Sequence, residues 1–261
     1  MIRRPRETQP DPITSEIGQF LAPLVIFPWG PLAMNYLGVP IVIGTAMVAV
    51  RDEDYEAACQ KLKDSAFNAV VPDHRPAPEL LARLPDPDKV MRMVNKQYER
   101  LDQSTTTFDY PITHHLAGRL KLNLLPNSFA HLPIQDIDLE PDTITIPNKD
   151  YNIYGNIFHP LERPLVESLA KGVLSDEDDE DAPTSVWGES LNTWVAMMVS
   201  YLEVNNDILD GCLDERVVEW FSVNFGRIHE EKFGPWDTRV SKRLGSGREM
   251  PVDMRGNPLP K

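Results

Sequence analysis

Two short acidic motifs in this sequence have the residue types and spacing of a metal site. Asp-x-Asp pairs occur at Asp52-Glu53-Asp54 and at Asp136-Ile137-Asp138. Two carboxylates one residue apart on a strand share a face, and carboxylate oxygens are ligands that Mg²⁺ prefers. Asp136 and Asp138 could hold a metal in this way, or they could lie at an exposed edge or turn. The first motif opens an expected helix, where acidic side chains cap the helix and oppose its dipole.

The histidines and cysteines are the other candidates for metal or nucleophilic chemistry. His114 and His115 are expected in a loop between two strands, and histidine titrates near neutrality, so acid–base work or metal binding is open to them. Adjacent side chains usually project in different directions, which disfavours one shared metal. Cys59 falls on the apolar stripe of an expected helix, and Cys212 has no base at a recognisable spacing. We therefore predict no metal and no cofactor.

Four basic residues, Lys89, Arg92, Lys96 and Arg100, recur at helical spacing. An ordinary solvated face explains them, and so does a strip that contacts phosphate or RNA. The whole chain has 26 Lys and Arg against 40 Asp and Glu, a formal net charge of −14. Such a charge argues against bulk nucleic-acid binding. The strip is therefore the best candidate for binding a small phosphorylated or RNA-linked substrate.

Composition narrows the class of protein. Hydrophobic residues make up 41% of 261 residues, enough for a sizeable core. No apolar run approaches the roughly 18 residues that span a bilayer, and the N-terminus has no secretory pattern. Two distant cysteines fit a reducing compartment. We expect a soluble cytoplasmic protein without membrane contact; its oligomeric state stays open.

The elements that must position these residues change in type at Pro160. Before it, β-branched runs predict strands, above all a strand buried on both faces at 41–50. After it, apolar residues recur with helical periodicity. We expect a mobile arm at 1–14, a mixed half at 15–158, a helical half at 160–236 and an irregular tail at 237–261. The predicted class is α+β, a small mixed β-sheet flanked by helices and followed by a helical C-terminal half. Further strands are expected at 67–71, 105–110, 119–125, 143–146 and 151–154, helices at 15–22, 88–101, 161–174, 185–205 and 214–228, and a solvated acidic loop at 176–181.

One segment carries a family resemblance. Residues 29–40, WGPLAMNYLGVP, resemble the start of nucleotidyltransferase-fold proteins, especially a divergent set common in filamentous fungi. In that pattern a strand leads to a glycine, a short helix, Gly-Val-Pro and a buried strand. Residues 124–128, LLPNS, and a Trp-rich helix around Trp194 also match, so the resemblance covers roughly residues 20–225. It implies a substrate cleft beside Gly30 and Thr45, and the basic strip is the other substrate-binding candidate.

The sequence also departs from that family. Active members place Gly-Ser at the helix start and Asp-x-Asp on the next strand, where the acids hold divalent metals. Here Pro31 follows Gly30, and the strand reads Thr45-Ala46-Met47, without a carboxylate. The usual two-metal site is not expected, and whether the chain is an enzyme stays open.

Three functions fit this pattern. One is a transferase redirected to a nucleotide- or RNA-linked substrate, for instance aminoacyl transfer in fungal natural-product synthesis. Another is a catalytically silent binding or regulatory protein, a pseudoenzyme of the same fold. The third retains activity with metals held by Asp136 and Asp138.

Overall fold

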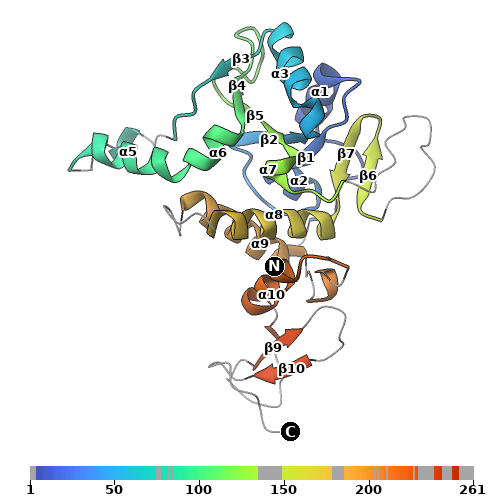
Figure 1. The fold of residues 1–261 in the computed structure, drawn as a ribbon. Coiled ribbons are helices and arrows are strands. Elements are labelled where there is room, and N and C mark those ends of the chain that lie inside the picture. The colour runs from blue at the N-terminus through green and yellow to red at the C-terminus, as the bar shows by residue number, and fades with distance from the viewer. Residues whose placement is uncertain are drawn as a thin grey trace.

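A computed structural model describes residues 4–74, 78–81, 83, 85–134, 149–177, 185–202, 204, 206–209, 211–225, 227–228, 238–242 and 249–252 (Figure 1). The predicted class is confirmed: the chain is an α+β protein, with a five-stranded mixed sheet, helices on both sides of it and a mainly helical segment after residue 160 (Figure 1). None of the helices in the described ranges has the length and hydropathy of a transmembrane span.

The sheet is built around one parallel pair. β2 (Thr45–Val50) and β5 (Lys121–Pro126) run parallel in the middle, and the long connection between them supplies the crossover that parallel strands need. The other neighbours, β1 (Phe27–Trp29), β4 (Thr106–Asp109) and β3 (Asn68–Val70), pair antiparallel in the order β1-β2-β5-β4-β3. A hairpin of β6 (Tyr151–Tyr154) and β7 (Ile157–Pro160) joins the β1 side through a bridge between Ile26 and Ile157.

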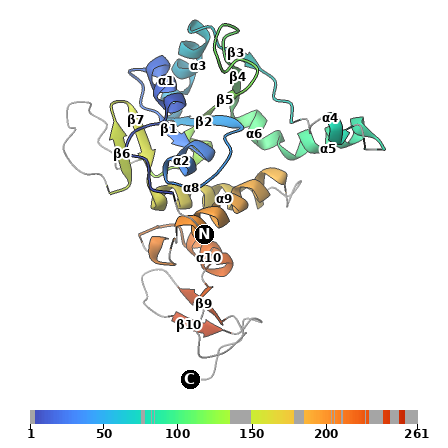
Figure 2. The ribbon, with the colours of Figure 1, turned by 180° about the vertical axis from the view of Figure 1, so that it is seen from behind.

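Alternation along β2 divides the core in two. Ala46, Val48 and Val50 contribute to an apolar cluster with α1 (Pro12–Leu21) and α3 (Tyr55–Asp64). Met47 and Ala49 belong to a second cluster with α2 (Pro31–Tyr36) and the C-terminal helices. Figures 1 and 2 show α1 and α3 on one side of the sheet and the C-terminal helices on the other. Every residue of β2 from Ala46 onward is buried, as predicted for a strand covered on both faces.

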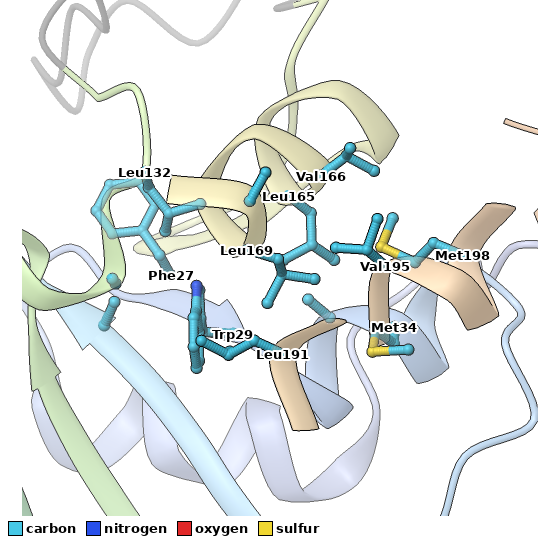
Figure 3. Close-up of a cluster of buried hydrophobic side chains, with 14 of the residues drawn as sticks. Phe27, Trp29, Met34, Leu132, Leu165, Val166, Leu169, Leu191, Val195 and Met198 are labelled. Carbon is cyan, nitrogen blue, oxygen red and sulfur yellow. The ribbon is translucent and has the colours of Figure 1, made fainter. Parts of the chain in front are cut away.

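The C-terminal helices cover the second face. They are α8 (Glu162–Glu177), α9 (Val186–Leu202) and α10 (Glu215–Phe225). Figure 3 shows Leu165 and Leu169 of α8 and Leu191 and Val195 of α9 gathered with Trp29 of β1. The indole Nε1 of Trp29 donates to Ser168 Oγ at 2.7 Å, and Ser168 donates in turn to the Ala130 carbonyl. This relay ties the sheet to α7 (Asn127–Ala130) and α8.

The expected acidic loop begins inside a helix. α8 runs through Glu177, and Asp176 is buried, 4% exposed. Its Oδ2 accepts a 2.5 Å hydrogen bond from Ser185, whose Oγ accepts from the Gly188 amide at the start of α9. A Cβ on Gly188 would lie 2.2 Å from Asp176 Oδ2, so only glycine admits this carboxylate. The prediction of a solvated residue was wrong for Asp176, while 178–181 lie outside the described residues.

Other boundaries differ for local reasons. Residues 41–44 form no strand: β2 starts at Thr45, after Pro40 and Gly44. The first helix is capped by Asp11 instead of Ser15. The helix expected at 88–101 breaks at Tyr98 into α5 (Pro87–Gln97) and α6 (Glu99–Ser104). The strand expected at 143–146 lies outside the described residues. The remaining elements are α4 (Pro78–Leu81), the 3₁₀ turns η1 (Asp52–Asp54) and η2 (Asn206–Leu209), and the strands β8 (Arg227–Ile228), β9 (Thr238–Lys242) and β10 (Glu249–Val252), the last two within the tail expected to be irregular.

Among the histidines that the structure describes, His159 of β7 is the most deeply buried. Its ring stacks on Tyr36 with centroids 3.9 Å apart, and it is fully buried. Within the described part of the chain, neither ring nitrogen has a hydrogen-bond partner. Burial disfavours the charged imidazolium and lowers the pKa of His159 to about 4, against a slight opposing effect of Asp11. The folded protein therefore holds this side chain neutral.

We predict that His159 makes the protein sensitive to mild acid. Between the folded pKa of about 4 and the unfolded value near 6.5, the unfolded chain binds more protons, so stability rises with pH in this window. The contribution is up to about 3 kcal/mol, lost as the pH falls from 6.5 to 4. His159→Phe keeps a ring against Tyr36 and should remove this slope in urea unfolding between pH 4.5 and 7. Identical pH slopes for the two proteins would refute the assignment.

Candidate functional site

A cleft of about 520 Å³ lies on the face of the sheet that α9 covers. Alternation and register bring its floor together: Thr45 pairs with Lys121, and Asn123 lies between Met47 of β2 and Thr107 of β4. Because residues two apart share a face, Thr45 and Met47 point the same way as Lys121 and Asn123. All five side chains line the cleft. Thr45 was predicted as a substrate-binding residue, and it lies in this lining.

Asn123 is the unusual residue of this floor. It is 4% exposed, yet its Oδ1 has no hydrogen-bond donor among the described residues. A buried polar atom left unpaired costs about 1–3 kcal/mol, so such atoms are rare and often mark a site. An amide offers both a donor and an acceptor. The floor of the cleft therefore holds a buried amide whose oxygen has no donor among the described residues.

Aromatic side chains form the wall. Trp187 and Trp194 of α9 meet edge to face, with centroids 5.6 Å apart, and Tyr98 lies in the same lining. Gly30 has φ +53°, and a Cβ there would lie 3.0 Å from the Trp194 ring and 3.3 Å from Met47 Sδ. Gly30, predicted to bind substrate, thus allows Trp194 to approach the sheet.

His74 and Asp102 meet at the edge of the cleft. His74 Nε2 lies 2.9 and 3.0 Å from the two carboxylate oxygens of Asp102, and the imidazole stacks on Tyr98 at 3.9 Å. Both residues line the cavity. They are 28 positions apart in the sequence, and neither belongs to a motif, so sequence reasoning missed them.

The basic strip is only partly assembled. Lys89, Arg92 and Lys96 are exposed on one side of α5, a helix that extends away from the sheet (Figures 1 and 2). We call these three residues the α5 basic arc. Lys96 lines a hollow of about 510 Å³ that shares Pro72, Asp102 and Thr107 with the cleft. Arg100 lies on α6, 3.9 Å from Asp176 and over the Phe129 ring, outside the arc.

The histidine pair forms a hydrogen-bonded cluster with Glu16. The ligand atoms of Glu16, His114 and His115 lie within 4.8 Å of one another. His114 Nδ1 accepts from the Leu116 amide, and Nε2 is 2.7 Å from Glu16 Oε1. The ring proton is therefore on Nε2, the atom a metal would need. The cluster is a contact between α1 and the 110–120 loop rather than a set of three free ligands.

Of the remaining candidates, Asp52 has a structural partner. Asp52 accepts from the Ser128 amide and hydroxyl, and Asp136 and Asp138 lie outside the described residues. Burial raises the pKa of both Cys59 and Cys212, which disfavours the thiolate. A third cavity, of about 540 Å³, is lined by Arg163, Lys171 and Glu167, whose charges pair with one another.

Comparison of the chain with family models, with curated proteins and with solved structures found no match. The arguments for a function therefore come from the cleft itself.

The neutral residues of the cleft floor predict that the protein binds complexes of a metal ion with a nucleoside triphosphate only weakly. Thr45 and Met47, where the resembled family has acids, and Asn123 on the neighbouring strand are neutral, while Mg²⁺ prefers carboxylates. We expect calorimetry with ATP and the other nucleoside triphosphates to give the same weak signal with Mg²⁺ as with EDTA. Tight binding that depends on Mg²⁺ or Mn²⁺ would contradict the prediction.

Proposed function

We propose that this chain is a nucleotidyltransferase-like protein that binds a nucleotide-linked substrate in its cleft and transfers a group from it without a two-metal clamp. The observation that carries the proposal is the buried amide oxygen of Asn123, which has no hydrogen-bond donor among the described residues, in an aromatic-walled cavity. A nucleobase has a flat face for Trp194 or Tyr98 and a hydrogen-bonding edge for an amide.

The cleft lining holds one cation, Lys121, that would meet an anionic group, beside the carboxylates of Asp73 and Asp102. Lys121 lines the floor beside Thr45, and its ion pair with Asp109 is 3.7 Å long between side chains that are 42% and 46% exposed. Such an exposed ion pair contributes little to stability, so Lys121 can leave Asp109 and bind a phosphate instead. The α5 basic arc continues outward through the hollow at Lys96. Together they would meet the phosphate of a nucleotide or of a short RNA end.

Asn123→Leu tests the site. Leucine has nearly the same shape and removes the unpaired oxygen, so we expect unchanged or higher stability in urea unfolding. Binding of the four ribonucleoside monophosphates, followed by tryptophan fluorescence in EDTA, should weaken about tenfold or more for the base that binds best, a loss of about 1.4 kcal/mol.

Asn156→Leu is the matched control. Asn156 Nδ2 donates to the Gly18 and Leu24 carbonyls at 2.9 Å, so its loss should destabilise the fold by about 1–3 kcal/mol and leave binding unchanged. The proposal fails if Asn123→Leu destabilises the protein and spares binding, as Asn156→Leu should.

The α5 basic arc gives a second prediction. Arg92→Ala with Lys96→Ala should lower the salt dependence of binding to a single-stranded RNA oligonucleotide by about one log–log unit per lost phosphate contact. Stability should change by less than about 1 kcal/mol, since both side chains are exposed. Lys63→Ala with Arg119→Ala removes two exposed cations outside α5 and should change neither. Equal slopes for the two double variants would place the anion contact elsewhere.

A catalytically silent binding protein is the second candidate. It is favoured by the neutral side chains of Thr45 and Met47, which leave no metal-binding pair on β2. A silent protein would give the same binding results as the proposed transferase, but it would not turn over any bound nucleotide.

A further inference from the structure

The pair of His74 and Asp102 has the arrangement of a base and its orienting group. Three contacts hold His74 in place: the carboxylate of Asp102, the Tyr98 ring at 3.9 Å, and a 3.3 Å hydrogen bond from its backbone amide to Asn95 Oδ1. The two side chains are 22% and 21% exposed, so they are largely fixed yet open to the cleft.

The carboxylate decides which ring nitrogen of His74 is basic. A carboxylate accepts hydrogen bonds, so neutral His74 carries its proton on Nε2 and directs it to Asp102. The lone pair is then on Nδ1. A nucleophile or proton donor, a base within reach and a third group that orients the base are the parts that acid–base catalysis requires. The chain supplies the last two in the lining of the cleft that also contains Asn123.

We propose that His74 is the general base of the cleft and that Asp102 positions it for acyl transfer from a nucleotide ester. This inference rests on the proposed nucleotide site. An acyl transfer suits a cleft with neutral Thr45 and Met47, because a base and an oriented ester suffice without metal ions.

In this step the oxygen or nitrogen of an acceptor hydroxyl or amine forms a bond to the ester carbonyl carbon. His74 Nδ1 takes the proton that the acceptor loses. The bond from that carbon to the ribose oxygen breaks, and the ribose oxygen keeps the electron pair. His74 returns the proton to this oxygen. The products are the acylated acceptor and the free nucleotide.

The test uses the 3′-O-acetyl esters of the four ribonucleoside monophosphates, with glycinamide as the acceptor amine and chromatography of the products. We expect turnover by the wild type. His74→Ala should lower kcat by about 10²–10⁴-fold with little change in KM, and added imidazole should restore part of the loss. A merely structural histidine would not give rescue by imidazole.

Asp102→Asn keeps the side-chain shape and serves as the second variant. It should lower kcat by less than His74→Ala, and ¹⁵N spectra of the histidine rings should show the His74 proton shared between Nδ1 and Nε2 instead of confined to Nε2. Asn123→Leu should raise KM instead of lowering kcat, which separates binding from chemistry.

Three results would overturn the assignment of His74 as the general base. They are no turnover by the wild type, a loss in His74→Ala that appears in KM alone, or a His74 ring protonated on Nδ1 in the wild type. In each case, binding of the unacylated nucleotides that depends on Asn123 would leave the proposed binding site intact. Absence of that binding would instead remove the proposed function.

Discussion

Burial of Trp29 is the interaction on which the arrangement of the two halves depends. An indole can be buried without loss only where its N–H finds an acceptor, and here the Ser168 hydroxyl on α8 provides one at 2.7 Å. The hydroxyl then satisfies the Ala130 carbonyl at the end of α7. The ring itself contacts Trp187 and Trp194, with centroids 6.0 and 5.9 Å away. One side chain of the edge strand β1 therefore fixes α7, α8 and α9 against the sheet.

That packing also shapes the cleft. Since α9 is held by Trp29, Trp194 lies over Gly30, where any larger residue would meet its ring. The aromatic wall is thus part of the core, and it should stay in place whether or not a ligand is bound. The floor of the cleft is less completely satisfied, because Asn123 is buried and its Oδ1 has no hydrogen-bond partner in the described part of the chain. Local departures from good packing are expected where function demands them, and this one falls in the cleft that Trp187 and Trp194 also line.

The sequence predicted most of the helices and strands of this fold but few of the contacts between side chains. Runs of β-branched and apolar residues identify β2, β4 and β5, and the 3.6-residue period identifies α8, α9 and α10, because these patterns are local in the sequence. The run at 41–50 misled because apolar residues also occur in loops, and Val42 is 88% exposed. Asp176 was misread because its burial depends on Ser185 and on the absence of a side chain at Gly188. His74 and Asp102 are brought together by the fold of the long β3–β4 connection. Asn123 stands out only because its Oδ1 has no donor among the residues that the structure describes.

The missing carboxylates bear on both proposed functions through electrostatics. In the resembled family, acids on the strand attract metals, and the metals then neutralise the triphosphate. Without metals, the same acids would repel a phosphate at close range in a protein that already carries −14. Thr45, Met47 and Asn123 avoid that repulsion, and the carboxylate of Asp102 at the edge is engaged by His74. Neutral residues at these positions are therefore what a metal-free site for an anionic ligand requires. Loss of the Asp-x-Asp pair removes metal-dependent chemistry, which favours a silent binding protein, and it leaves room for a transferase that uses a base instead of metals.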